Sequence, residues 1–385
     1  MSASTSSVQG QRKWTIRVPA SSANIGPGFD VLGLALSRHL TLSVTLTPCE
    51  DSSATVILSY EGEGAAEAPL DPYKNLITRV ALYVLLSHNL SFPTSAIVNV
   101  AVSNQVPFGR GLGSSASAVV AGVLLASALG DLKLSEERIK DYSLMVERHP
   151  DNVTAALVGG FTGSFLRTLD PSELAPSSIP LAEVLPAYPP NAGPPLPGQA
   201  PPPQPPVCVG RHVRYGLAKE VGVVVVVPKF EVETAKARGA LPASYSRADV
   251  VFNLQRLAVL TATLGVSPPN AEIIWEAMRD KVHQPWREGL IPGLSKILNT
   301  MTPATHPGLL GVCLSGAGPT ILALVLKDEV STISTDASEI TLASGNGSRM
   351  AEIGEAIKTL WKTEGIEVEW MALEVDEDGA TCVEH

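Results

Sequence analysis

A glycine-rich segment of this chain reads Val106-Pro107-Phe108-Gly109-Arg110-Gly111-Leu112-Gly113-Ser114-Ser115-Ala116-Ser117-Ala118. The apolar residues before it, 96–102, predict a β-strand, and the small and apolar residues 116–129 predict a buried helix. The glycines therefore lie on a strand-to-helix turn at the N-terminus of a helix. Such a helix end carries unpaired N–H groups and roughly half a positive charge, which favours binding of an anion such as phosphate.

The spacing of this segment excludes two well-known phosphate loops. A P-loop needs Lys and then Ser or Thr directly after its last glycine, whereas Ser114 and Ser115 follow Gly113. The alternating glycines also miss the Gly-x-Gly-x-x-Gly spacing of dinucleotide-binding proteins. For the glycines alone, an ordinary glycine-rich turn remains an alternative, but the serines and the following helix favour a phosphate site.

The segment closely resembles the ATP loop of the GHMP superfamily of small-molecule kinases, which contains galactokinase, homoserine kinase, mevalonate kinase and phosphomevalonate kinase. Its backbone N–H groups would approach the phosphates where glycines leave no Cβ in the way. The resemblance implies that ATP is bound by Pro107, Gly109, Arg110, Gly111, Leu112, Gly113, Ser114, Ser115 and Ala116.

The composition is that of a globular protein. The chain has 385 residues, enough for two domains, with 45% hydrophobic and 17% charged residues. Its net charge of −10 argues against a surface for nucleic acid or acidic membranes. No apolar run approaches the ~20 residues of a membrane helix. The four cysteines lack the spacing of a metal site, so we expect reduced thiols and a cytoplasmic location.

Composition divides the chain into four parts. We predict a flexible tail at 1–12, an N-terminal ATP-binding domain at 13–170, a Pro-rich insertion or linker at 171–209 and a C-terminal domain at 210–385. Strands and helices mix without steady βαβ alternation, which favours the α+β class. The Pro-rich part ends in Pro201-Pro202-Pro203-Gln204-Pro205-Pro206 and is interpreted as a surface linker, or alternatively as a docking motif for a Pro-binding partner.

Residues 14–18 predict the start of a strand, and a polar turn follows that reads Pro19-Ala20-Ser21-Ser22-Ala23-Asn24-Ile25-Gly26-Pro27-Gly28-Phe29-Asp30. Taken alone, Asn24 could cap the turn and Asp30 could start the next element. Together with the apolar residues after it, the turn resembles the opening motif of the homoserine kinase family. There the matching Asn and Asp bind the substrate amino acid, and the Asp lies against the hydroxyl that attacks the phosphate.

A second motif reads Glu147-Arg148-His149-Pro150-Asp151-Asn152-Val153. Its residues alone predict the end of one helix and an Asp that begins another. The motif resembles the His-x-Asp-Asn segment of the same family, which makes Glu147 the magnesium carboxylate and places Asn152 against the substrate. Because Mg²⁺ prefers hard oxygen ligands, we expect Ser115 to be its second protein ligand, with Ser114 as the alternative.

Two further segments resemble the family through arginine residues. Thr234 and Arg238 match its substrate-facing Thr and Arg, and Arg287 matches its second substrate arginine. A single Arg is more often a surface charge, but two guanidinium groups suit one α-carboxylate because each pairs with both oxygens. The turn at 314–320 matches the third superfamily motif, although an ordinary hairpin fits its residues nearly as well.

The resemblance implies a two-domain fold, with an N-terminal domain like domain 2 of ribosomal protein S5 and a ferredoxin-like C-terminal domain. It also implies ATP- and Mg²⁺-dependent phosphorylation of L-homoserine to O-phospho-L-homoserine in threonine biosynthesis. In this interpretation Asp30 and Glu147 are the catalytic residues, and Asn24, Asp30, Asn152, Thr234, Arg238 and Arg287 bind the substrate. We expect small-molecule partners and allow a homodimer. The alternatives are a mevalonate-type kinase, a non-catalytic ligand sensor and a Pro-rich scaffold.

Overall fold

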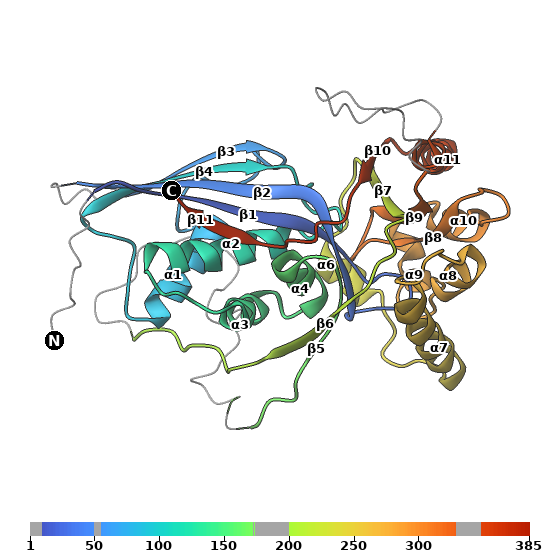
Figure 1. The fold of residues 1–385 in the computed structure, drawn as a ribbon, viewed down its shortest axis with the longest axis horizontal. Coiled ribbons are helices and arrows are strands. Elements are labelled where there is room, and N and C mark those ends of the chain that lie inside the picture. The colour runs from blue at the N-terminus through green and yellow to red at the C-terminus, as the bar shows by residue number, and fades with distance from the viewer. Residues whose placement is uncertain (1–9, 50–54, 172, 174–199, 329–347) are drawn as a thin grey trace.

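The computed structural model describes residues 10–49, 55–171, 173, 200–328 and 348–385, and it contains two β-sheets with helices packed against them (Figure 1). The first sheet has seven strands, in the order β11-β1-β2-β4-β3, with β5 paired to β2 and β6 paired to β5. Among the described strand pairs of this sheet, only β3–β4 is parallel. These strands are Arg12–Ala23 (β1), Leu32–Pro48 (β2), Val56–Gly62 (β3), Ala96–Asn104 (β4), Phe161–Leu166 (β5), Gly210–Tyr215 (β6) and Thr381–Glu384 (β11).

One face of this sheet is apolar and is covered by helices. The alternating side chains Leu40, Leu42, Val44 and Leu46 of β2 are buried, as expected for a strand with one face against a core. They join the core that the helices form on that face, with α2 running through its middle (Figure 1). The helices are Leu76–Ser87 (α1), Ser114–Leu129 (α2), Glu136–Glu147 (α3) and Pro150–Val158 (α4).

The second sheet has four antiparallel strands in the order β10-β7-β9-β8. The strands are Val221–Pro228 (β7), Leu309–Leu314 (β8), Ile321–Leu326 (β9) and Val368–Leu373 (β10). The other elements of this part are Thr234–Gly239 (α6), Arg247–Thr263 (α7), Ala271–Ala277 (α8), Gln284–Arg287 (α9), the 3₁₀ turn Glu288–Leu290, Leu294–Thr300 (α10) and Arg349–Thr363 (α11).

Strand β7 is buried on both faces, which explains its unbroken valine run. Val223 and Val225 point into a core that also contains Leu32 and Phe161 of the first sheet. Val224 and Val226 point the other way, into the core around Trp361 of α11. Strand β7 therefore contributes to two cores, and one of them joins the two sheets.

The predicted domain boundaries stay a prediction, but the strand pairing shows how the segments on either side of them are connected. The predicted C-terminal domain begins at Gly210, yet β6 pairs with β5, and β11 pairs with β1. Both ends of the C-terminal segment therefore belong to the first sheet. Of the predicted tail, residues 1–9 lie outside the described residues and Arg12 already begins β1. Within the described residues, no helix combines the length and apolar character needed to cross a bilayer.

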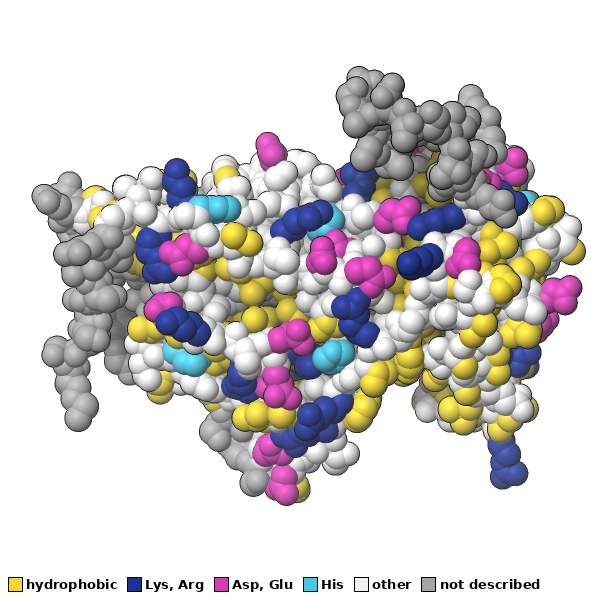
Figure 2. Space-filling view, in the orientation of Figure 1, with side chains coloured by type: hydrophobic (Ala, Val, Ile, Leu, Met, Phe, Trp, Pro, Cys, Tyr) yellow, Lys and Arg dark blue, Asp and Glu magenta, His cyan; other side chains and the backbone are white. Residues whose placement is uncertain are grey.

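Helix α7 exposes much of its apolar surface. Only Asn253 and Leu260 of this helix are buried, whereas Val250, Val251 and Leu254 are exposed. Figure 2 shows hydrophobic side chains gathered where α7 and α8 lie in Figure 1, while acidic and basic side chains are mixed over the rest of this face. Most of α7 therefore lies outside the cores that hold the sheets together.

The end of the Pro-rich segment lies across α1 and α3. The carbonyl of Pro203 accepts a hydrogen bond from the Tyr83 hydroxyl at 2.7 Å. The guanidinium of Arg138 donates to the carbonyls of Pro205 and Pro206, at 3.1 Å each. Proline has no N–H but keeps its carbonyl, so the prolines here bind only as acceptors, whereas the side-chain amide of Gln204 donates to the carbonyl of Ser87 at 3.2 Å. Residues 203–206 are thus fastened to the chain's own helices, while the part at 174–199 lies outside the described residues.

Arg138 also holds a buried carboxylate beside this contact. It lies 2.7 Å from Asp141, which is fully buried and accepts from the backbone N–H groups of Cys208 and Val209. We therefore expect Arg138→Ala to lower the free energy of unfolding by about 2–3 kcal/mol, the usual range for hydrogen bonds to charged groups.

Urea denaturation of the full chain measures this effect. The matched control is Arg211→Ala, which removes an exposed ion pair with Glu137 at 3.6 Å and should cost less than about 1 kcal/mol. Equal losses in the two variants would show that Arg138 does not hold the segment.

Candidate active site

The glycine-rich segment forms the loop between β4 and α2, as predicted. Gly109, Gly111 and Gly113 all have positive φ, at +62°, +79° and +71°. A Cβ on Gly111 would lie 2.3 Å from the carbonyl oxygen of Ser315, and one on Gly113 would lie 2.1 Å from Ser21 Oγ. The left-handed backbone and this close packing both require glycine. The loop leads directly into α2, whose first residue is Ser114.

Two distant segments hold this loop in place. Ser315 Oγ, in the turn between β8 and β9, donates to the carbonyl of Gly111 at 2.6 Å. Ser21, near the end of β1, donates its backbone N–H to the carbonyl of Leu112 at 3.1 Å. The predicted third motif at 314–320 therefore packs against the phosphate loop and is not an isolated hairpin.

The remaining predicted ATP residues have mixed environments. Pro107, Leu112 and Ala116 are buried, so they shape the loop from within. The Arg110 guanidinium lies 3.9 Å from the carboxylate of Glu63. Ser114 and Ser115 line a cavity beside the loop. The two serines at the start of α2 thus face open space, together with the exposed Gly109.

This cavity has a volume of about 600 Å³ and was not foreseen from the sequence. Tyr60 of β3 and Phe108 of the loop form part of its wall, with their ring centroids 6.2 Å apart in an edge-to-face arrangement. Lys74 and Asn75, just before α1, complete another side. Phe108 stands inside the quoted segment and could have suggested an aromatic wall. Tyr60 reaches this wall only because β3 pairs with β4, which the sequence did not indicate.

Glu147 and Ser115 meet beside the loop. Ser115 Oγ donates a short hydrogen bond to Glu147 Oε1, which brings the end of α3 to the start of α2. Burial raises the pKa of Glu147, and the hydrogen bond from Ser115 opposes this rise. A carboxylate and a hydroxyl oxygen are donors that fit Mg²⁺. In the described part of the chain, no group of three or more His, Cys, Asp or Glu side chains is placed to hold a metal ion.

The predicted substrate residues Asn24 and Asp30 belong to one tight turn. Both have positive φ, at +58° and +55°. Asn24 Oδ1 accepts the backbone N–H of Asp30 at 2.8 Å, and its Nδ2 donates to the carbonyl of Gly316 at 2.8 Å. Asn24 therefore shapes the turn, in keeping with its interpretation as a cap, and presents Asp30 at the edge of the site.

Asp30 and Arg238 form an ion pair that the sequence did not reveal. Arg238 Nη2 lies 2.6 Å from Asp30 Oδ1, and Nη1 lies 3.2 Å from Oδ2. The same Nη2 donates to His149 Nδ1 at 2.9 Å. The resemblance assigns Asp30 to the substrate hydroxyl and Arg238 to the carboxylate. Without a ligand, the charges of these two side chains pair with each other and link the turn after β1 to α6.

The second arginine, Arg287, lies next to the first. It is buried, and its Nη1 donates to the carbonyl of Gly316 at 2.9 Å. The Phe29 ring centroid is 5.5 Å from the Arg238 guanidinium carbon and 5.6 Å from that of Arg287. Burial and the charge of Arg238 lower the pKa of Arg287 to about 10, so it remains a cation at neutral pH. Phe29, which the sequence did not mark as a site residue, therefore lies against both cations.

Asn152 and Thr234 are the two remaining predicted substrate residues. Asn152 Oδ1 accepts a hydrogen bond from Ser21 Oγ at 2.9 Å, close to Gly113 of the phosphate loop. Thr234 is exposed at the start of α6, four residues before Arg238 and thus on the same helix face. Next to Asn152, burial and the charge of Asp30 raise the pKa of Asp151 to about 7.

Comparisons with known proteins give the family of this chain. The family model for the GHMP kinases N terminal domain matches residues 75–160. Homoserine kinase from Saccharomyces cerevisiae is 49% identical, over 96% of this chain and 98% of its own. Homoserine kinase from Schizosaccharomyces pombe is 45% identical, over 96% and 98%.

Solved structures share the fold. A crystal structure of homoserine kinase from Cytophaga hutchinsonii matches with a TM-score of 0.69 at 22% identity, over 99% of this chain and 100% of that one. Mevalonate kinase from L. major, in complex with R-mevalonate, matches with a TM-score of 0.52 at 14% identity, over 96% and 98%. At these identities the two structures support the fold alone. Through its close sequence relatives, the chain belongs to the homoserine kinase family of GHMP kinases, as its motifs predicted.

Proposed function

We propose that this chain transfers the γ-phosphoryl group of ATP to the side-chain hydroxyl of L-homoserine and forms O-phospho-L-homoserine, a step of threonine biosynthesis. The observation that carries this proposal is the group of Asp30, Arg238 and Arg287 around Phe29, beside the glycine loop. The two arginines can bind the carboxylate of this substrate, and Asp30 can accept a hydrogen bond from its hydroxyl.

ATP is the co-substrate, as membership of a kinase family implies. Its phosphates would lie over Gly109–Ser115 at the N-terminus of α2, where backbone N–H groups and the helix dipole favour anions. Its base would enter the cavity walled by Tyr60 and Phe108. Glu147 and Ser115 would hold Mg²⁺, which neutralises charge on the β- and γ-phosphates when bound.

The homoserine carboxylate would pair with Arg287 and Arg238. Asn152 and Thr234 would contact the rest of the amino acid, and Asn24 would act by holding the turn that carries Asp30. Binding of the carboxylate gives Arg238 a second anionic partner. Asp30 then becomes free to accept a hydrogen bond from the substrate hydroxyl.

In the transfer step, the hydroxyl oxygen forms a bond to the γ-phosphorus while the bond from that phosphorus to the bridging oxygen breaks. ADP leaves with the electron pair of that bond, and the hydroxyl proton passes to solvent or to a phosphate oxygen. Phosphoryl transfer has a loose transition state, so alignment and charge neutralisation supply most of the rate. Asp30 therefore acts by orienting the hydroxyl and need not remove its proton.

The proposed activity is tested by ADP release with Mg-ATP and a panel of L-homoserine, L-serine, mevalonate and galactose. We expect the highest kcat/KM with L-homoserine, because only this compound combines the right chain length with an α-amino acid carboxylate. Faster turnover of mevalonate would favour the mevalonate-type alternative. ATP binding without turnover of any compound would favour the ligand sensor.

The role of Asp30 is tested by Asp30→Asn. We expect kcat to fall by about 10²-fold or more, since the amide orients the hydroxyl less well and leaves Arg238 without its anion, while ATP affinity is unchanged. Asp328→Asn is the control, because that carboxylate also pairs with an arginine, Arg349, but lies at the outer end of β9. An unchanged kcat in Asp30→Asn would contradict the assignment.

The metal ligands are tested by Glu147→Gln. We expect the Mg²⁺ concentration for half-maximal rate to rise about tenfold or more, because an amide oxygen is a weaker ligand than a carboxylate. Titration of Mg²⁺ at fixed ATP measures this shift, and Glu276→Gln is the exposed control. The same Mg²⁺ dependence in both variants would place the ion elsewhere.

Two further features complete the proposal. All four cysteines are free thiols, which supports a cytoplasmic location. The homodimer that the family resemblance allows stays a prediction.

A further inference from the structure

We propose that His283 is a positioning residue that fixes the guanidinium of Arg287 for the substrate carboxylate. This inference rests on the proposed function, since it concerns how that carboxylate is recognised. The segment that carries Arg287 and resembles the family contains this histidine, but the resemblance assigns it no role and it is not among the predicted site residues.

The two ring nitrogens of His283 have different partners. Nε2 lies 2.9 Å from the carbonyl oxygen of Gly26, and Nδ1 lies 3.2 Å from Arg287 Nη1. A carbonyl only accepts and a guanidinium only donates, so Nε2 carries the hydrogen and Nδ1 offers its lone pair. Complete burial lowers the pKa of His283, although Asp280 opposes this, and the ring stays neutral as the acceptor role requires.

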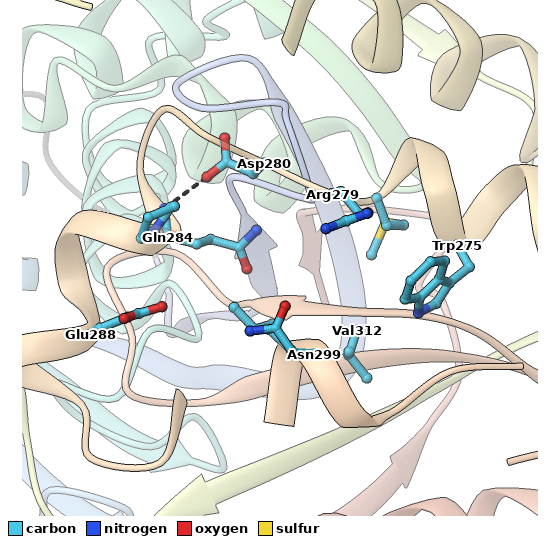
Figure 3. A pocket seen from close by; sticks show the side chains of 10 residues that line it. Trp275, Arg279, Asp280, Gln284, Glu288, Asn299 and Val312 are labelled. Atoms are coloured by element: carbon cyan, nitrogen blue, oxygen red, sulfur yellow. Dashed lines mark hydrogen bonds between the residues drawn. The ribbon is translucent and has the colours of Figure 1, made fainter. Parts of the chain in front are cut away.

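A buried carboxylate places His283 in this position. Asp280 accepts the backbone N–H groups of Val282, His283 and Gln284 at 2.9, 2.9 and 2.7 Å. Figure 3 shows the contact with Gln284 above a small cavity. Asp280 also accepts from the side chain of Asn253 of α7 at 2.7 Å. A single helical turn such as α9 is unstable alone, so these bonds supply its rigidity.

The side chain of Gln284, the first residue of α9, also ties this helix to the second sheet. Gln284 Oε1 accepts the backbone N–H of Leu314, the last residue of β8, at 2.8 Å. Arg287 lies four residues after His283 and therefore on the same face. The hydrogen bonds of Asp280 and Gln284 thus fix the backbone of His283 and Arg287. The guanidinium at the end of the long Arg287 side chain needs further contacts.

His283 provides one of the few contacts that hold this guanidinium. Arg287 Nη1 donates to His283 Nδ1 and, at 2.9 Å, to the carbonyl of Gly316, while Nε makes a longer bond of 3.4 Å to Ala237. Among the described residues, these acceptors occupy Nη1 and Nε and leave Nη2 to a ligand. Loss of the His283 contact would release one N–H of Nη1 and let the planar group turn away from the carboxylate.

Phe29 links the histidine to both arginines. Its ring stacks on His283 with centroids 5.5 Å apart and an interplanar angle of 25°. The same ring lies against Arg238 and Arg287. Gly26 and Phe29 belong to the turn that carries Asp30, so His283 also connects α9 to the residue proposed to orient the hydroxyl.

Two conservative variants separate the roles of the two nitrogens. In His283→Asn the amide oxygen can take the place of Nδ1 and accept from Arg287. In His283→Gln the amide nitrogen can take the place of Nε2 and donate to Gly26, but the contact with Arg287 is lost. We expect His283→Gln to raise the homoserine KM about tenfold or more, as for loss of a hydrogen bond to a charged group, and His283→Asn to raise it less than about threefold.

Several readouts distinguish positioning from stability. The KM for ATP should stay within about twofold in both variants, and their thermal midpoints should be similar. In an Arg287→Ala background, His283→Gln should add less than about twofold to the homoserine KM, because its effect acts through Arg287. His306→Gln, which replaces a half-buried histidine near α10, is the matched control.

If Arg287→Ala does not fold, a substrate that lacks the carboxylate gives the same information, because it cannot use the contact with Arg287. The kcat/KM for 3-aminopropan-1-ol should be the same in the wild type and in His283→Gln. Equal effects of Asn and Gln on the homoserine KM, or an effect of Gln on this carboxylate-free compound, would overturn the inference. Failure of the wild type to phosphorylate homoserine would instead refute the proposed function.

Discussion

The carbonyl oxygen of Gly316 accepts hydrogen bonds from Asn24 and from Arg287, at 2.8 and 2.9 Å. The N–H of the same glycine donates to the carbonyl of Ala23 at 2.8 Å, and the preceding Ser315 holds Gly111 of the phosphate loop. One peptide turn of the second sheet thereby fixes the turn that carries Asp30, the second arginine and the glycine loop. A site whose parts come from two sheets needs such a junction, because small displacements of reacting groups cost large factors in rate.

The distribution of charge suits an anionic ligand. Arg238 and Arg287 lie against one aromatic ring, and their mutual repulsion together with burial holds the pKa of Arg287 well below its usual value. Asp30 balances Arg238 in the ligand-free protein. Asp151, with a pKa of about 7, adds only part of a negative charge near Asp30. A substrate carboxylate therefore enters a region where two guanidinium groups lie against one ring, with Asp30 and the buried Asp280 as the carboxylates whose charges act on Arg287.

The local motifs were predictable because their chemistry is set within a few residues. Positive φ and close packing at Gly111 demand glycine, and the serine-led helix after it is visible as a run of small apolar residues. The alternation on β2 and the valine run of β7 likewise reflect burial on one face or on both. The Asp30–Arg238 pair was not predictable, since its partners are far apart in sequence and each already had another role assigned by resemblance.

The contacts of His283 and Phe29 were also not predictable from the sequence. A histidine followed four residues later by an arginine suggests a shared helix face, but the carbonyl of Gly26 and the ring of Phe29 come from the other end of the chain. Residue type and short-range spacing were enough to locate the glycine loop, and the resemblance of the motifs was enough to identify the family. The partner of each charged group was decided by the packing of the two sheets, because hydrogen bonds and ion pairs depend on distances that a linear pattern does not contain.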